Sequence, residues 1–116
     1  FYKVTPDGSI DTETHDGFRA QVQPLLNEKT KALVLDLGYV DYISSAGLGV
    51  LFSIKKRLAE HNGHLIFCRV KPQIKKLFDI VKALPKHMLF TSFEEADKYF
   101  YQIMDQEIAR QKKENS

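Results

Sequence analysis

The stretch ALVLDLGYVDYISSAGLGVL, residues 32–51, joins a short apolar run to a segment with helical spacing, and this junction decides the fold. Its first six residues, ALVLDL, have the length of a β-strand and are almost continuously apolar, which predicts a strand buried on both faces. From Ser44 to about His61 the pattern is that of a helix, which an Asn-Gly pair ends. A strand followed directly by a helix is the repeating unit of α/β domains.

The rest of the chain repeats this alternation. The first ten residues favour an edge strand, and the helix that follows has Phe18 and Val22 among its apolar positions. Further along, the pattern predicts a strand at 64–70, a helix from Pro72 to Pro85, a short strand at 88–90 and a last helix opened by a Ser92–Glu95 capping box. The predicted fold is one α/β domain, residues 1–104, with a central mixed, largely parallel sheet and about four helices. Residues 105–116 are expected to form a charged helix end or tail, of which the last seven residues, RQKKENS (110–116), are expected to fray.

Composition limits the classes of function. The net charge of +2 is too small to indicate a nucleic-acid or membrane partner. No apolar run reaches 18 residues, and no leader-like segment marks the chain for export. The single cysteine, Cys68, lies in the apolar run HLIFC, which predicts a buried, reduced thiol. These features favour a cytoplasmic domain.

The helix that begins at the serine pair has two unlike faces. Four apolar residues share the face predicted to pack on the sheet: Val50, Leu51, Ile54 and Leu58. The opposite row holds Ser45, Gly49, Phe52 and Lys56. Gly49 costs the helix about 1 kcal/mol relative to alanine, and internal packing cannot explain a glycine at an outward position. We therefore expect a partner to approach closely there, with Phe52 offering apolar area and Lys56 at the rim.

The two serines at the helix start have a simple interpretation, in which Ser44 is the N-cap and Ser45 a tolerable first-turn residue. The N-terminus of a helix also carries about half a positive charge and accommodates anions. A phosphate on Ser45 would add ~1.5–2 negative charges without unfolding the helix. The same charge would block a partner that buries this patch, because an unpaired buried charge costs several kcal/mol. The pattern thus favours a switch that changes binding and spares the fold.

The sequence LVLDLGYVDYISSAGLGVL resembles the signature of the STAS family, in particular the bacterial anti-sigma factor antagonists. Supporting segments are GSIDTET before it and GHLIFCRVKPQIKKLFDI and LFTSFEEA after it. The resemblance implies a cytoplasmic protein whose unmodified form binds an anti-sigma factor that is also a serine kinase of the GHKL type. Phosphorylation of one serine releases the antagonist, and a metal-dependent serine phosphatase resets it.

The family pattern places the phosphorylated residue at Ser45, two residues before GLG. Most members have aspartate just before the phosphoserine, whereas this chain has Ser44. We predict a partner-binding surface made of Ser44, Ser45, Gly49, Phe52, Lys56 and Asp11. Asp11 is included because it opens the first helix, and it is expected with Asp36 at the same end of the sheet as Ser45; capping and solvation are the simpler interpretation of both.

Two other functions remain open from the residues. The domain could be a constitutive STAS interaction or sensor module that is never phosphorylated, or a small hydrolase that uses Ser45. A hydrolase would need a histidine base, and nothing in the sequence places His15, His61, His64 or His87 beside Ser45. His61 and His64 lack further ligands at metal-site spacing, and no phosphate-binding glycine motif is present. We therefore predict no enzyme activity, metal or cofactor.

Overall fold

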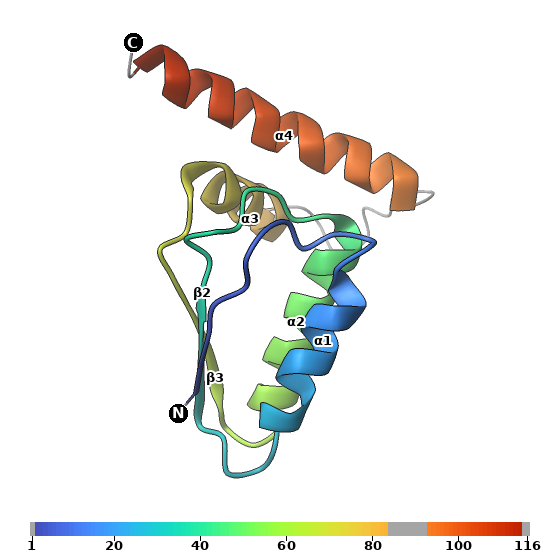
Figure 1. Cartoon of the computed structure of the whole chain (residues 1–116), viewed down its shortest axis with the longest axis vertical. Coiled ribbons are helices and arrows are strands. Elements are labelled where there is room, and N and C mark those ends of the chain that lie inside the picture. Colours follow the sequence, from blue (N-terminus) through green and yellow to red (C-terminus); the bar gives the residue numbers. More distant parts are fainter. Residues whose placement is uncertain (1, 84–92, 115–116) are drawn as a thin grey trace.

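The computed structural model describes residues 2–83 and 93–114 and confirms the α/β class (Figure 1). The strands are β1 (Tyr2–Val4), β2 (Ala32–Asp36) and β3 (His64–Cys68). The helices are α1 (His15–Val22), the 3-10 turn η1 (Gln23–Leu25), α2 (Ser45–Ala59), α3 (Pro72–Ala83) and α4 (Phe93–Glu114). The strand predicted at 88–90 and the cap predicted at Ser92 lie outside the described residues.

The described strands form a parallel sheet in the order β1-β2-β3. In its register Tyr2 pairs with Leu33, and Leu33 pairs with Leu65. After β1 the chain stays beside the segment that follows β2, because isolated parallel bridges join Asp7 to Tyr39 and Ile10 to Ile43. These bridges place the N-terminal segment beside the start of α2.

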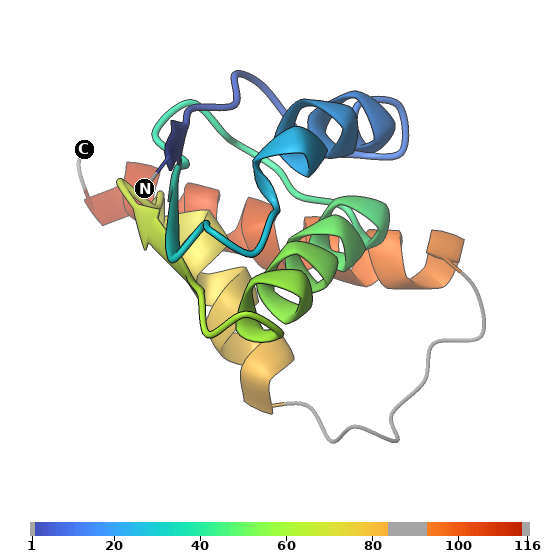
Figure 2. The ribbon, with the colours of Figure 1, turned by 90° about the horizontal axis from the view of Figure 1, so that it is seen from below.

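Helices α1 and α2 lie side by side on one face of the sheet, while α4 crosses the end at which the strands finish (Figures 1 and 2). Leu33 and Leu35 of β2 point into the core and are fully buried. Val34 between them is only half-buried, and its β3 partner Ile66 is 46% exposed. The prediction that this strand is buried on both faces was therefore wrong: the described helices α1 and α2 cover one face of the sheet.

The ends of α2 are as predicted, with Ser44 at the N-cap. The chain leaves the helix through Asn62, whose φ of 60° is left-handed, a conformation that asparagine tolerates better than most residues. The Gly63 amide donates to the Leu58 carbonyl oxygen at 2.7 Å and closes the end of the helix. The cysteine prediction was only partly right, since Cys68 is half-buried. None of the described helices has both the length and the apolar content needed to cross a bilayer.

Helix α4 continues to Glu114, so the expected fraying from residue 110 is not seen. Arg110 explains the difference, because it pairs with Glu107 and, one turn later, with Glu114. Glu107 is 8% exposed, and its hydrogen bonds with Arg110 and Gln111 lower its pKa to about 2. The last turns of α4 are therefore held by charge pairs on a partly buried carboxylate.

We predict that Arg110→Gln raises the pKa of Glu107 from about 2 toward its ordinary value of 4.5. Because the folded-state pKa is depressed, the stabilisation that Arg110 gives is present above the unfolded pKa and is lost as the pH falls from about 4.5 to about 2. Carboxyl-detected NMR titration measures the pKa directly. Lys112→Gln removes the same charge from an exposed position and should leave the pKa of Glu107 unchanged. An equal pKa shift in both variants would contradict the pairing of Arg110 with Glu107.

Candidate functional site

The candidate site is built at the first turn of α2. Ser44 has an extended backbone (φ −83°, ψ 174°) and is 1% exposed. Its Oγ accepts a hydrogen bond from the Gly47 amide at 3.2 Å, and its own amide donates to the Ile10 carbonyl oxygen at 2.9 Å. Ser44 thus satisfies one free amide of the helix start and ties it to the N-terminal segment.

Gly47 is required by the close approach of that segment. A Cβ at this position would lie 2.3 Å from the Ile10 carbonyl oxygen, far inside van der Waals contact. The oxygen belongs to the backbone and already accepts the Ser44 amide, so it cannot swing aside. Gly47 therefore faces inward, and the neighbour it meets is the chain at Ile10.

The outward row predicted on α2 is confirmed for three residues. A Cβ at Gly49 would meet nothing within 4 Å, Phe52 is 54% exposed, and Lys56 is exposed. The four residues predicted to face the sheet are buried to 2% exposure or less: Val50, Leu51, Ile54 and Leu58. Phe52 also lines a groove of about 430 Å³ between α2, β3 and α3, together with Leu51, Phe67 and Phe78.

Ser45 departs from the expected exposure. The residue as a whole is half-buried, and its Oγ is fully buried. The helical angle alone places it on the row of Gly49, but the first turn of α2 lies at the crowded end of the sheet, which α4 crosses (Figure 1). An outward angle therefore did not give an accessible hydroxyl.

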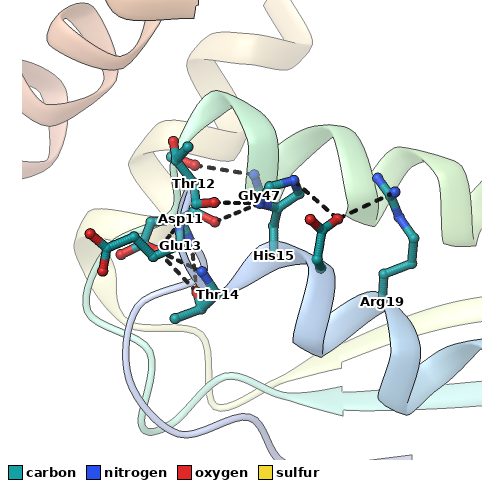
Figure 3. Close-up of polar contacts among 9 residues, drawn as sticks. Asp11, Thr12, Glu13, Thr14, His15, Arg19 and Gly47 are labelled. Carbon is teal, nitrogen blue, oxygen red and sulfur yellow. Dashed lines mark hydrogen bonds and ion pairs between the residues drawn. The ribbon is translucent and has the colours of Figure 1, made fainter.

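Asp11 lies directly after Ile10 and is half-buried. Its Oδ1 accepts hydrogen bonds from the Glu13 amide at 2.9 Å and the Thr14 amide at 3.0 Å, which shapes the entry to α1 (Figure 3). His15 is held in the same cluster, its Nδ1 lying 2.9 Å from the Thr12 carbonyl oxygen. Asp11 therefore borders the start of α2, as expected, and its carboxylate holds the turn that precedes α1. A role in partner binding stays a prediction.

The structure adds an ion pair that sequence reasoning missed. Arg69 Nε donates to both carboxylate oxygens of Asp36, at 2.8 and 2.9 Å, and the hydrogen bond lowers the pKa of Asp36. The Arg69 guanidinium also lies 5.0 Å from the Tyr39 ring centroid. A Cβ at Gly38 would be 2.6 Å from Arg69 Cζ, so this glycine makes room for the arginine. The local signal in the sequence was the pair Gly38-Tyr39 after the strand, but Arg69, which both residues contact, lies about thirty residues further along the chain.

Tyr42 is the second residue that was missed. Its hydroxyl donates to Asp105 Oδ1 of α4 at 2.9 Å, and its ring centroid lies 5.5 Å from that of Tyr101. The hydrogen bond to Asp105 raises the pKa of Tyr42. The contact joins residues 63 apart in the sequence, and no local pattern indicates it.

Comparison with known proteins identifies the family. Residues 1–96 match the STAS domain family. A Bordetella bronchiseptica protein, BtrV, described as a candidate anti-sigma factor antagonist, is 34% identical over 73 residues, which are 63% of each chain. An anti-sigma-B factor antagonist of Staphylococcus epidermidis is 31% identical over 80 residues, 69% of this chain and 74% of the relative.

A solved structure supports the same fold. The anti-sigma factor antagonist SpoIIAA in its unphosphorylated form matches with a TM-score of 0.57 and 17% identity, covering 85% of this chain and 87% of that chain. The fold is thus an α/β fold of the STAS type. The chain belongs to the STAS domain family, and relatives that it matches are named anti-sigma factor antagonists.

We predict that Gly47→Ala destabilises the domain by about 1–3 kcal/mol, because the added methyl group collides with the Ile10 carbonyl oxygen. Gly49→Ala is the matched control in the same helix: its methyl group enters open space, so better helix propensity should stabilise by up to about 1 kcal/mol. Urea unfolding followed by circular dichroism measures both. Equal effects of the two substitutions would show that the close approach at Gly47 does not exist in solution.

Proposed function

We propose that this domain is an anti-sigma factor antagonist that works as a phosphorylation-gated switch in the cytoplasm. In its unmodified form it binds an anti-sigma factor with serine kinase activity of the GHKL type and so frees a sigma factor. Phosphorylation at Ser45 ends the binding, and a metal-dependent serine phosphatase restores it. The observation that carries the proposal is the exposed row of Gly49, Phe52 and Lys56, which starts at the serine pair.

This row has the composition of a docking surface. Phe52 offers a large apolar side chain to solvent, and Gly49 leaves the helix backbone open to close contact. An exposed aromatic beside a bare backbone is expected at the centre of an interface, where packing is dense, while Lys56 suits the rim. Burial of this row against a partner would exclude water from the first two turns of α2.

A phosphate on Ser45 would act on binding more than on folding. Ser44 supplies the cap through its contact with the Gly47 amide, so modification of the next residue leaves that hydrogen bond in place. The positive end of the α2 dipole favours the new charge. A partner that covers the row would instead have to desolvate ~1.5–2 negative charges, which opposes docking.

One observation favours a second function. Because the Oγ of Ser45 is buried, the domain in this conformation does not present its hydroxyl to a kinase. A constitutive STAS interaction module, which binds through the same row and is never phosphorylated, accounts for that burial. The two functions differ in whether Ser45 ever carries phosphate.

We predict that incubation with the cognate anti-sigma factor and ATP adds one phosphate to the domain, at Ser45. Intact-mass measurement followed by peptide mapping locates it. Ser45→Ala should abolish the modification, whereas Ser44→Ala, which alters the cap, should keep the site available. A phosphate on Ser44 would overturn the assignment of the site to Ser45, and no phosphate on any serine while the complex still forms would support the constitutive module.

We predict that Gly49→Leu weakens binding of the unmodified domain to its anti-sigma factor at least tenfold, about 1.4 kcal/mol, because the side chain fills the space that the partner needs. Isothermal titration calorimetry measures the affinity. Gly17→Leu makes the same change at another exposed helical glycine with nothing within 4 Å of its Cβ position, so it controls for altered helix propensity. Unchanged affinity in Gly49→Leu would show that this glycine is not part of the interface.

A further inference from the structure

Helix α4 lies across the end of the sheet, and its first turns reach the N-terminal end of α2 (Figures 1 and 2). It packs against both α2 and α3. Its apolar side is well buried, with Phe100 5% exposed, Ile103 8% and Met104 fully buried. The helix is therefore docked on the end of the domain where Ser45 lies.

With α4 docked in this way, the Ser45 hydroxyl is not accessible for phosphorylation. Phosphoryl transfer from ATP requires Ser45 Oγ to come within about 3–3.5 Å of the γ-phosphorus along an open line of approach. The reaction forms the bond between Oγ and phosphorus, breaks the bond to the β-phosphate oxygen, releases ADP and passes the hydroxyl proton to a base. A buried Oγ cannot meet this requirement until its cover moves.

Tyr42 connects the segment before Ser45 to α4. Its hydroxyl donates to Asp105 of α4, and its ring lies against Tyr101 of the same helix. The Tyr42 carbonyl oxygen accepts the Ile10 amide at 3.1 Å, which anchors the residue to the body of the domain. Asp41 beside it pairs with Lys71, just before α3. The segment that leads into α2 is thus held to the domain on one side and to α4 on the other.

We propose that α4 is a cover that must leave the start of α2 before Ser45 can be phosphorylated, and that the contacts of Tyr42 with Asp105 and Tyr101 hold it closed. This inference rests on the proposed function and adds its regulation. After phosphorylation the cover cannot close again, because redocking would bury the phosphate charge next to α4, which carries Asp105. The phosphorylated domain then exposes the apolar side of α4, around Phe100 and Met104.

The test uses Tyr42→Phe, which removes the hydrogen bond to Asp105 and keeps the ring. Asp105→Ala removes the same bond from the other side. Tyr2→Phe is the matched control, because Tyr2 is 44% exposed and begins β1 at the far end of the sheet (Figure 1). Hydrogen exchange of the amides at 45–48 is measured without any partner, and the initial rate of Ser45 phosphorylation is measured with the kinase and ATP.

We expect both Tyr42→Phe and Asp105→Ala to speed exchange at 45–48 and phosphorylation together, about fivefold, as the loss of one hydrogen bond implies. Tyr2→Phe should match the unaltered domain. If exchange and phosphorylation were both unchanged in Tyr42→Phe and in Asp105→Ala, the proposal that α4 covers Ser45 would be overturned. Faster exchange with no phosphate on Ser45 in any variant would uphold α4 as a cover and overturn the proposed switch.

Discussion

The contact between the Ile10 carbonyl oxygen and the first turn of α2 is the constraint on which the site depends. That oxygen accepts the Ser44 amide at 2.9 Å and leaves no room for a Cβ at Gly47. The contact fixes where α2 begins, and with it the direction of every residue along the helix. The buried face of Val50, Leu51, Ile54 and Leu58 and the exposed row of Gly49, Phe52 and Lys56 both follow from that starting point.

Local patterns predicted the parts of the fold that local physics controls. The start and end of α2 and the choice of its buried face were available from spacing and capping. The resemblance to the STAS family was likewise carried by one continuous segment and is confirmed by the match over residues 1–96.

Most of the errors concern contacts between distant segments. The exposure of Ser45 was predicted from its angle on the helix, but burial of its Oγ depends on what lies over the end of the sheet. The pairs Asp36–Arg69 and Tyr42–Asp105 join residues 33 and 63 apart, which no periodicity reveals. The order of the last turns of α4 depends instead on pairs within that helix, between Arg110 and Glu107 and between Arg110 and Glu114.

Neighbouring residues at the start of α2 have different roles in the fold and in the proposed binding. The cap at Ser44 and the glycine at 47 belong to the fold, whereas in the proposed switch Ser45 and the row beyond it are where an added charge would meet a partner. The most direct test compares the affinity for the anti-sigma factor of two forms of the full domain, unmodified and carrying phosphoserine at position 45. We predict at least tenfold weaker binding of the phosphorylated form. Equal affinity of the two forms would contradict it.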